Sequence, residues 1–319
     1  MSRLIADVGG TNVRFAVVAG SKLLTEPESF HCADYPSIVE AAQDYLSKSG
    51  QDASFDEAAF AVAAAVTGDW IDITNSHWAF SQADVARRLN VKRIKFLNDF
   101  TALALGLPHL PAESALPLNE AQAVKNAPIA VIGPGTGLGV SGLLPDGKGR
   151  WAPIAGEGGH ATLSARTERE FAVVNQAQKQ FGHCSAERLV SGPGLVTLAE
   201  IIDYLDGRPF VQRTPADVAT MAQNGSCPVC AEAMDLLLAF LGTTASNLAL
   251  TLGSFGGLYL AGGILPRLGA DRLKASPLMA RFADKGRYRD YLASIPVMLV
   301  VHPLPAFLGL GNLPIEAAP

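Results

Sequence analysis

A strand–turn–strand unit with a glycine-rich turn occurs twice in this sequence. In the first copy, residues 4–18 read as two strands around Gly9-Gly10-Thr11-Asn12. In the second copy, residues 129–144 read as two strands around Gly133-Pro134-Gly135-Thr136-Gly137. The return of one supersecondary unit about 125 residues later predicts a duplicated architecture with a phosphate chain held between the copies.

The composition of both turns indicates phosphate binding. Glycines leave backbone N–H groups uncovered, so a phosphate can approach them, and the hydroxyl of Thr11 adds a donor. Gly and Asn tolerate positive φ, which we expect in the turn at residues 9–12. Asp7 precedes this turn and can hold the Mg²⁺ that phosphates carry. A plain hairpin turn with a solvated Asp is the alternative. Pro134 removes one backbone donor from the second loop.

Asn98 and Asp99 follow an apolar run at residues 93–97 that alternates like a half-buried strand, and strong helix formers come next. Ligands of open α/β sheets bind at the carboxyl ends of strands. An Asp at such an edge can accept the proton of a substrate hydroxyl, and an adjacent Asn can orient that hydroxyl. Asp99 as a helix cap is the alternative, and it is the stronger one for this motif alone. The two glycine-rich turns favour the catalytic interpretation.

Two further glycine motifs provide candidate ligands for a sugar and a nucleotide. Residues 156–160 place Glu157 and His160 among glycines, and a carboxylate with an imidazole suits neighbouring sugar hydroxyls. A solvated loop is the alternative for Glu157. Gly262 and Gly263 end a strand at residues 256–261 and suit close passage of a base or ribose. A tight strand-to-helix connection explains this pair equally well.

Composition excludes several classes of function. The chain has 319 residues, of which 49% are hydrophobic and 17% charged, enough for a large core and two domains. Its net charge is -5 without a basic block, so nucleic-acid binding has no electrostatic footprint.

No apolar run reaches the ~20 residues of a membrane span. Residues 228–252 should be a buried helix, because Glu232, Asp235 and Asn247 interrupt it. Residues 1–5 lead straight into a strand without signal-peptide architecture, so we expect a cytoplasmic protein.

The four cysteines are too sparse for a disulfide framework in a chain of this length. Cys227 and Cys230 have CxxC spacing, but no second pair accompanies them, as a zinc site would require. An ordinary thiol pair at a helix start is favoured over a redox or metal site. Four prolines between residues 108 and 128 predict a domain crossing. A last helix from Pro305 suits a return to the first domain.

Taken together, these motifs make the chain resemble the bacterial ATP-dependent glucokinase family, which has the actin-like, sugar-kinase ATPase (ribonuclease H-like) α/β fold. The motifs follow the family's order over almost the whole length: residues 6–12, 67–70, 98–101, 135–139, 156–160, 186–194 and 261–264. The zinc signature of related transcriptional regulators is missing, and no DNA-binding helices precede the first strand. The resemblance implies a smaller α/β domain of residues 1–108 plus 302–319, a larger α+β domain of residues 109–301, and an active site in the cleft between them.

The resemblance also implies a role for each motif residue. Asp99 matches the catalytic base, and the glucose-hydroxyl ligands are Asn98, Glu157, His160 and Glu187. The first phosphate loop is Gly9, Gly10 and Thr11, and the second is Gly135, Thr136 and Gly137. Asp7 is expected at Mg²⁺, and Gly262 and Gly263 at the nucleotide. The implied cofactors are therefore ATP and Mg²⁺.

The implied reaction transfers the γ-phosphoryl group of ATP to the 6-hydroxyl of glucose and yields glucose 6-phosphate and ADP. The expected protein is a cytoplasmic enzyme of glycolysis that binds glucose and ATP, with no nucleic-acid or membrane partner, and it is compatible with a homodimer. Two alternatives stay open: a kinase for another hexose or an N-acetylated hexosamine, and a non-catalytic sugar-sensing regulator. The presence of Asp99 argues against the regulator.

Overall fold

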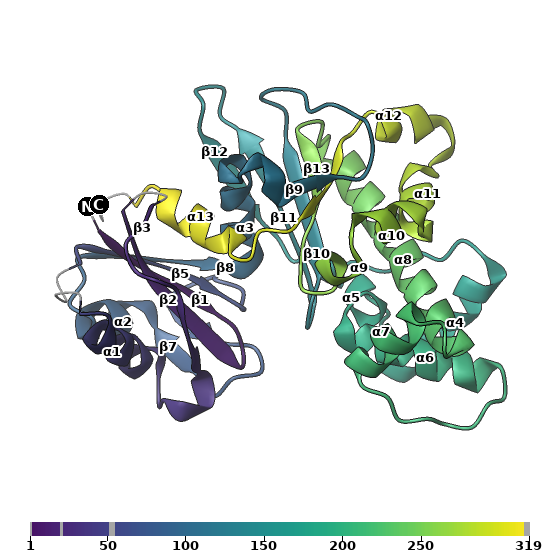
Figure 1. Ribbon diagram of the computed structural model, residues 1–319, viewed down its shortest axis with the longest axis horizontal. Helices are drawn as coiled ribbons and strands as arrows, with labels where there is room; N and C mark the ends of the chain where they lie inside the picture. The colour runs from purple at the N-terminus through teal and green to yellow at the C-terminus, as the bar shows by residue number, and fades with distance from the viewer. Residues whose placement is uncertain (1, 20–21, 51–54, 316–319) are drawn as a thin grey trace. The chain divides into compact units, whose positions relative to one another are not determined.

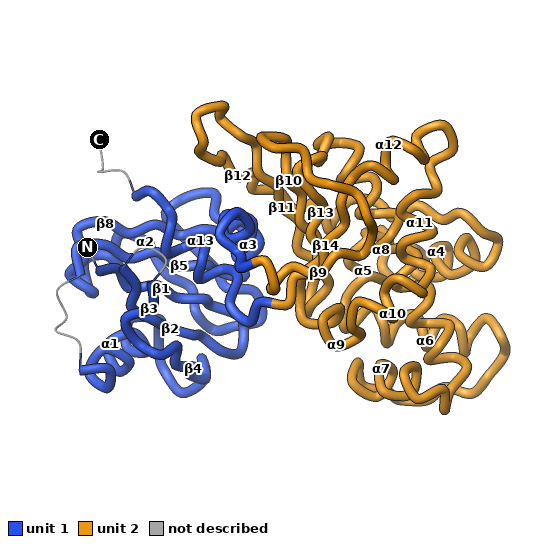
Figure 2. The backbone as a smooth tube through the Cα atoms, turned by 45° about the horizontal axis from the view of Figure 1, so that its top comes forward, with its two compact units in different colours: residues 1–111, 302–319 blue, residues 112–301 orange. Residues whose placement is uncertain are grey.

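The computed structural model describes residues 2–19, 22–50 and 55–315. The chain divides into two compact units: unit 1 is Met1–Pro111 with His302–Pro319, and unit 2 is Ala112–Val301 (Figure 2). Residues 316–319 of the expected first domain lie outside the described residues. The chain passes from unit 1 to unit 2 within the proline-punctuated stretch.

Unit 1 is built on a six-stranded sheet in which β1 is central (Figure 1). Its order is β3-β2-β1-β5-β8, and β4 also pairs with β2. β1 is antiparallel to β2 and parallel to β5, which is parallel to β8, as the expected first hairpin requires. The sheet strands are β1 (Arg3–Val8), β2 (Asn12–Ala19), β3 (Lys22–Leu23), β4 (Glu28–His31), β5 (Glu57–Val62) and β8 (Arg93–Asn98), and a separate two-stranded sheet pairs β6 (Trp70–Asp72) with β7 (Ala79–Ser81).

Apolar residues on both faces of this sheet pack against helices. Alternate residues of β1 divide between two clusters: Leu4 belongs to a cluster with residues of α1 (Ile38–Ser49) and α2 (Gln82–Arg88), and Ile5 to one with residues of α3 (Asp99–Gly106) and α13 (Pro305–Asn312). α3 and α13 pack closely where Gly309 faces Ala102. A Cβ on Gly309 would lie 1.9 Å from the carbonyl oxygen of Ala102, so only glycine fits there. The predicted return of the last helix to the first unit is confirmed, and α13 fixes the helix that starts at Asp99.

Unit 2 repeats the same topology. Its sheet has the order β12-β11-β10-β13-β14-β9, with an antiparallel hairpin of β10 and β11 followed by the parallel strands β13 and β14. The edge strand β9 is antiparallel to β14 and is an addition to the topology of unit 1. β1 and β10 both have six residues, and β2 and β11 both have eight. The predicted duplication is therefore confirmed. The strands are β9 (Ala115–Pro117), β10 (Ile129–Pro134), β11 (Leu138–Pro145), β12 (Trp151–Ala155), β13 (Gly257–Leu260) and β14 (Val297–Val300).

One long helix organises the core of unit 2. α8 (Pro228–Leu252) has the predicted bounds and packs against α6, α7 and α11. In the described part of the chain it is the one helix long and apolar enough to cross a membrane, with a mean hydropathy of 1.4, but 67% of that window is buried in the structure. This is the burial of a core helix. The other helices of the unit are α4 (Glu168–Phe181), α5 (Ala186–Leu189), α6 (Gly192–Leu205), α7 (Pro215–Gln223), α9 (Leu265–Leu268), α10 (Ala270–Ala275), α11 (Pro277–Ala283) and α12 (Arg289–Ala293).

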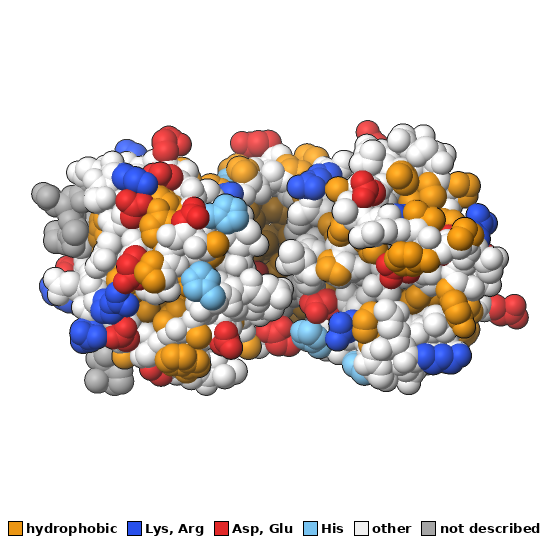
Figure 3. All heavy atoms as spheres, turned by 90° about the horizontal axis from the view of Figure 1, so that it is seen from below, with side chains coloured by type: hydrophobic (Ala, Val, Ile, Leu, Met, Phe, Trp, Pro, Cys, Tyr) orange, Lys and Arg blue, Asp and Glu red, His pale blue; other side chains and the backbone are white. Residues whose placement is uncertain are grey.

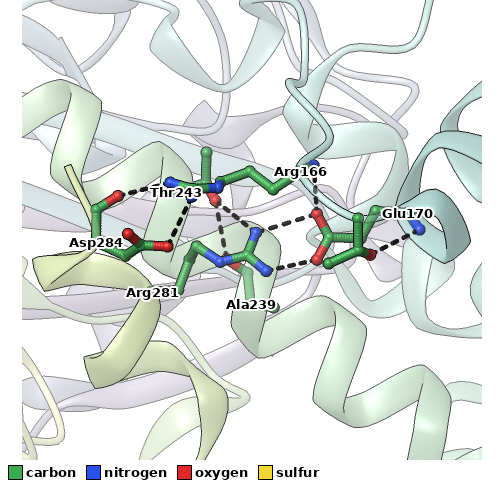
Figure 4. Close-up of polar contacts among 7 residues, drawn as sticks. Arg166, Glu170, Ala239, Thr243, Arg281 and Asp284 are labelled. Carbon is green, nitrogen blue, oxygen red and sulfur yellow. Dashed lines mark hydrogen bonds and ion pairs between the residues drawn. The ribbon is translucent and has the colours of Figure 1, made fainter. Parts of the chain in front are cut away.

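A buried ion pair ties three of these helices together. Glu170 of α4 is 2% exposed and accepts two hydrogen bonds from the Arg281 guanidinium of α11, at 2.5 and 3.0 Å (Figure 4). Arg281 also donates to Thr243 of α8 at 3.4 Å. Burial acts to raise the pKa of Glu170, but the bonds from Arg281 and from the N–H of Arg166 outweigh it and hold the pKa below its ordinary value. The charge of Glu170 is thus stabilised by the fold of unit 2.

The surface charge on one face of the molecule is mixed. On the face shown in Figure 3, Lys and Arg side chains are interspersed with Asp and Glu side chains over both units. This distribution gives that face no continuous basic stripe of the kind that nucleic-acid binding uses.

Candidate active site

The first glycine loop joins β1 to β2. Val8 pairs with Val13, so residues 9–12 close the turn, and the Gly9 N–H donates to the carbonyl of Asn12 at 2.9 Å. A Cβ on Gly10 would lie 2.6 Å from the carbonyl oxygen of Thr74. Neither glycine has a φ in the left-handed region, so the expectation of positive φ is wrong. Gly10 is instead required by close approach of a neighbouring backbone.

Backbone donors of this loop are open to a ligand. Among the described residues, the N–H groups of Gly10 and Thr11 have no hydrogen-bond acceptor. Thr11 is exposed, and its carbonyl accepts the N–H of Cys32 at 2.8 Å, which anchors the turn from one side. An anchored turn with two uncovered N–H groups has the chemistry of a phosphate-binding loop.

Asp7 lies one residue before the end of β1 and pairs across the hairpin with Arg14. Its neighbours Ala6 and Val8 are fully buried. Burial raises the pKa of Asp7 above its ordinary value, and the positive charge of Arg14 offsets part of that rise. A carboxylate whose charge is disfavoured by burial is stabilised by a nearby cation. The pairing with Arg14 could have been read from the sequence, because the two residues are nearly equidistant from the turn.

The surroundings of Asp7 fit a Mg²⁺ that arrives with a nucleotide. Within the described ranges, no group of three or more His, Cys, Asp or Glu side chains is arranged to hold a metal ion. Mg²⁺ commonly binds proteins through one or two carboxylates, with phosphates and water as its other ligands. Asp7 alone therefore suits Mg²⁺ carried by phosphates and does not suit a resident metal.

Asn98 and Asp99 occupy the junction between β8 and α3, as predicted. Asn98 is the N-cap, and its Oδ1 accepts the N–H groups of Phe100 and Thr101 at 3.0 and 3.2 Å. Its Nδ2 donates to the carbonyl of Ala64 at 3.5 Å, a long bond that leaves the amide NH₂ well placed for an added acceptor. Asp99 is the first helical residue, and its Oδ1 accepts the Phe100 N–H at 2.8 Å. The capping role considered for Asp99 thus belongs to Asn98.

Strand register brings these two parts of unit 1 to one sheet edge. Val8 pairs with Val62 of β5, and Val62 pairs with Asn98 of β8. Because all three strands are parallel, the residues that follow them emerge along the same edge. Asp7, the first loop and Asp99 therefore share the carboxyl edge of the sheet.

The second glycine loop joins β10 to β11 and is shorter than the first. Pro134 was expected inside the loop, but it is the last residue of β10 and pairs with Leu138, so it belongs to the strand. The Gly135 N–H donates to the carbonyl of Gly137 at 2.8 Å, so this donor is used inside the turn. Of the described loop, the N–H groups of Thr136 and Gly137 have no acceptor. The loop thus offers fewer donors than its glycine content predicts.

Gly262 lies against the end of β10. Its φ is +86°, and a Cβ there would lie 2.4 Å from the carbonyl oxygen of Pro134. A Cβ on Gly133 would in turn lie 2.4 Å from the carbonyl of Ala261. Gly263 is exposed, with open space beside it. The third glycine pair is therefore adjacent to the second loop, as a shared nucleotide site requires.

The predicted sugar ligands of unit 2 lie close together. Glu157 precedes the 3-10 helix Gly158–His160, and its carbonyl accepts the His160 N–H at 3.0 Å. His160 Nε2 lies 4.0 Å from Oε1 of Glu187, which belongs to α5. Both Glu157 and His160 are exposed, whereas Glu187 is half-buried. Unit 2 thus presents carboxylate and imidazole groups on neighbouring segments.

One contact of this group was absent from the sequence interpretation. The N–H of Leu138 donates to Oε2 of Glu187 at 2.8 Å. The partners are 49 residues apart, and no local pattern marks Leu138 as polar or functional. They come together because α5 and β11 both pack against the 3-10 helix Gly158–His160.

Two hairpins with glycine loops, an Asp at the carboxyl edge of a parallel sheet, and neighbouring carboxylate and imidazole groups are the arrangement of an actin-like ATPase of the sugar-kinase class. A glucokinase family model matches residues 4–315. A curated glucokinase of Paramagnetospirillum magneticum is 44% identical over 310 residues, which cover 97% of this chain and 96% of that protein. The chain belongs to the glucokinase family, which confirms the predicted family and enzyme class.

Solved structures agree with this assignment. A glucokinase from an Antarctic psychrotroph is 32% identical and has a TM-score of 0.84, covering 98% of both chains. A ROK family glucokinase from Streptomyces griseus, solved in complex with glucose and AMPPNP, is 18% identical, has a TM-score of 0.64 and covers 98% of each chain. The second similarity shows the shared fold, and the predicted fold class is confirmed.

Proposed function

We propose that this chain transfers the γ-phosphoryl group of MgATP to the 6-hydroxyl of glucose, with Asp99 as the base. The observation that carries the assignment is the register that puts Asp99 on the same sheet edge as the first glycine loop and Asp7. A phosphoryl acceptor and a phosphate chain must meet at such an edge for in-line transfer.

The residues of unit 1 handle the proton and the phosphates. The Asp99 carboxylate takes the proton of the 6-hydroxyl as its oxygen attacks phosphorus. Asn98 presents its NH₂ to a sugar oxygen, because its amide oxygen caps α3. Uncovered N–H groups of Gly10 and Thr11 bind phosphate oxygens, and Asp7 holds Mg²⁺. The bound Mg²⁺ neutralises charge that develops on the phosphates.

The residues of unit 2 orient the sugar and complete phosphate binding. Glu157, His160 and Glu187 act as acceptors and donors for the ring hydroxyls of glucose. The N–H groups of Thr136 and Gly137 bind the phosphate chain from the second loop, and Gly262 and Gly263 border the nucleoside. Phosphoryl transfer depends mainly on such positioning and charge neutralisation.

Two observations support the substrates and the location in the proposal. The Streptomyces griseus glucokinase of similar fold was solved with glucose and an ATP analogue. All four cysteines of this chain, Cys32, Cys184, Cys227 and Cys230, are free thiols. Free thiols suit a reducing, cytoplasmic compartment.

A coupled assay of ADP release with glucose, mannose, fructose and N-acetylglucosamine tests the proposal. Glucose should give the highest kcat/KM. A preference for another hexose or for the N-acetylated sugar would replace glucose as the substrate. Glucose binding without ADP release would contradict an enzyme and favour a sugar sensor.

Glu157→Gln tests the sugar site itself. The change keeps the volume but replaces an acceptor with a donor, so the proposed hydrogen bond to one sugar hydroxyl is lost. We expect lower kcat/KM for glucose and a smaller ratio between glucose and 2-deoxyglucose or mannose. Sites built on hydrogen bonds discriminate by up to ~10⁴-fold. Glu113→Gln, at an exposed position of the same unit, is the charge-matched control. Equal ratios in both variants would make Glu157 an ordinary loop residue.

A further inference from the structure

Glu187 has contacts that sugar binding alone does not explain. Its Oε2 accepts the N–H of Leu138 at 2.8 Å, and Leu138 is the first residue after the second loop. Its Oε1 faces His160, 4.0 Å from Nε2. The two oxygens of one carboxylate therefore face different partners. Oε2 holds the end of the phosphate loop, and Oε1 lies on the side of the sugar-binding imidazole.

Gly137 shows how closely the loop approaches this carboxylate. A Cβ at this position would lie 2.5 Å from Oε2 and 3.2 Å from Cδ of Glu187. The φ of Gly137 lies outside the left-handed region, so the Glu187 side chain, and not backbone strain, excludes a larger residue. A Cβ on Gly135 of the same loop would meet nothing within 4 Å. The loop is thus in contact with Glu187 at one glycine and open at the other.

The turn of residues 157–160, which carries the other proposed sugar ligands, also contacts Leu138. The carbonyl oxygen of Leu138 lies 2.1 Å from where a Cβ of Gly159 would be, so the turn of residues 157–160 rests directly on the start of β11. The N–H of Ala186 donates to the carbonyl of Ala161 at 2.9 Å. These two residues directly adjoin Glu187 and His160. The loop, the turn and α5 therefore form one closed set of contacts around Leu138.

We propose that Glu187 is a positioning residue of the second phosphate loop and couples the sugar site to the nucleotide site inside unit 2. This inference rests on the function proposed above. A sugar hydroxyl bound at Oε1 fixes the carboxylate, and the fixed Oε2 holds Leu138 and keeps the Thr136 and Gly137 N–H groups available to phosphates. Coupling between two binding sites is reciprocal, so a bound nucleotide strengthens sugar binding by the same factor. Factors of about 5 to 150 are typical.

Gly137→Ala tests the coupling from the loop side. The added methyl group meets the end of the flexible Glu187 side chain, so the carboxylate moves and the fold is retained. We expect the Kd for glucose, measured by calorimetry without nucleotide, to rise about tenfold, within the usual range of coupling. Gly135→Ala is the matched control and should leave that Kd unchanged, because its methyl group points into open space. An unchanged glucose Kd in Gly137→Ala would overturn the inference.

Glu187 variants test it from the nucleotide side without any sugar present. Binding of AMPPNP with Mg²⁺ should weaken about fivefold or more in Glu187→Ala. Glu187→Gln should lose less, because its amide oxygen can still accept the Leu138 N–H. Unchanged AMPPNP affinity in Glu187→Ala would show that Glu187 is a sugar ligand only. Far-UV circular dichroism of each variant checks that unit 2 is folded.

The two proposals fail in different ways. If the proposed function is wrong, the unmodified protein itself does not phosphorylate glucose, while the AMPPNP measurement still reports on Glu187 and the loop. If only the coupling is wrong, the unmodified protein phosphorylates glucose, and the ratio of glucose Kd values with and without AMPPNP is the same in the unmodified protein and Glu187→Gln.

Discussion

The two glycine loops stand on hairpins of equal strand length, yet they are completed in different ways. In the first loop, the backbone at Thr74 closes over Gly10. In the second loop, the side chain of Glu187 closes over Gly137. A backbone wall is stiff, whereas a carboxylate can move and can bind a ligand of its own. If both loops bind phosphate as proposed, we expect the first loop to be the more rigid site and the second to respond to what Glu187 binds.

The residue before each loop differs as well. Asp7 is the second-last residue of β1, and Gly133 is the second-last residue of β10. Position 133 cannot carry a carboxylate, because Ala261 fills the space of a Cβ. In the proposed function the two units therefore have different roles: unit 1 contributes the proposed Mg²⁺ ligand and the proposed base, and unit 2 contributes the proposed sugar-binding carboxylates.

The largest expected effect is on kcat, and it follows from a change of the proposed base in unit 1. Asp99→Asn keeps the shape of the side chain but cannot take a proton, so kcat should fall by about 10²–10⁴-fold. Glucose affinity should change little, because most proposed sugar ligands lie in unit 2. Steady-state kinetics and glucose calorimetry measure the two quantities. Asp34→Asn, an exposed aspartate of unit 1, is the control. Near-normal turnover in Asp99→Asn would move the base elsewhere.

The next effect concerns Mg²⁺ and tests whether only the first loop uses a metal. Asp7→Asn removes the charge and keeps the volume. The apparent affinity for Mg²⁺ in the kinase assay should fall by about 10–100-fold, as it does when outer partners of metal sites are changed. Raising Mg²⁺ should restore part of the turnover, and the glucose Kd should stay the same. Loss of glucose binding in this variant would assign Asp7 to the sugar site or to the fold.

A matched pair of glycine variants sharpens the contrast between the loops. Gly10→Ala puts a methyl group 2.6 Å from the Thr74 carbonyl, which has little freedom to move. Overpacking of this kind costs about 1–3 kcal/mol. We expect a lower melting temperature and a higher KM for ATP, with an unchanged Kd for glucose. Gly137→Ala should show the opposite pattern: the Kd for glucose should rise, and the melting temperature should change little. The same pattern in both variants would remove the distinction.

The smallest effect compares the two units in acid. Because the pKa of Glu170 is lowered in the folded state, its contribution to stability is complete above its unfolded pKa and is lost as the pH falls through the folded value. One such group changes the free energy of unfolding by at most about 1.4 kcal/mol per pH unit. Hydrogen-exchange protection factors, which are corrected for the intrinsic exchange rate at each pH, should therefore fall below pH 4.5 in peptides of α4, α8 and α11. Glu170→Gln should remove this pH dependence and leave that of unit 1 peptides unchanged. An equal acid response in both proteins would contradict the role of the ion pair.

Local sequence patterns were sufficient for much of the fold. Alternating apolar residues and glycine-rich turns predicted both hairpins, and a long apolar segment predicted α8 with its observed bounds. The strong helix formers after Asp99 predicted α3. Each of these signals arises from backbone preferences and periodic burial, which depend on residues that are close together in the sequence.

Errors occurred where the same residue types served purposes that distant contacts set. The glycines of the first loop were expected to take positive φ, but Gly10 is needed because Thr74 is close. Gly135 was expected to offer its N–H to phosphate, but the turn uses it internally. In each case, the residue type was right and its immediate reason was wrong.

The sequence by itself determined the duplicated α/β architecture, the family and the residue types of the proposed site. Their partners were decided only by the tertiary structure. Val62 aligns Val8 with Asn98 because three strands are in register, and this brings Asp7 and Asp99 to one sheet edge. Leu138 meets Glu187 because β11 and α5 both pack against the 3-10 helix Gly158–His160. The physical reason is the range of each interaction: backbone propensity and burial period act over a few residues, whereas a hydrogen bond across 49 residues exists only after the sheet and its helices have packed.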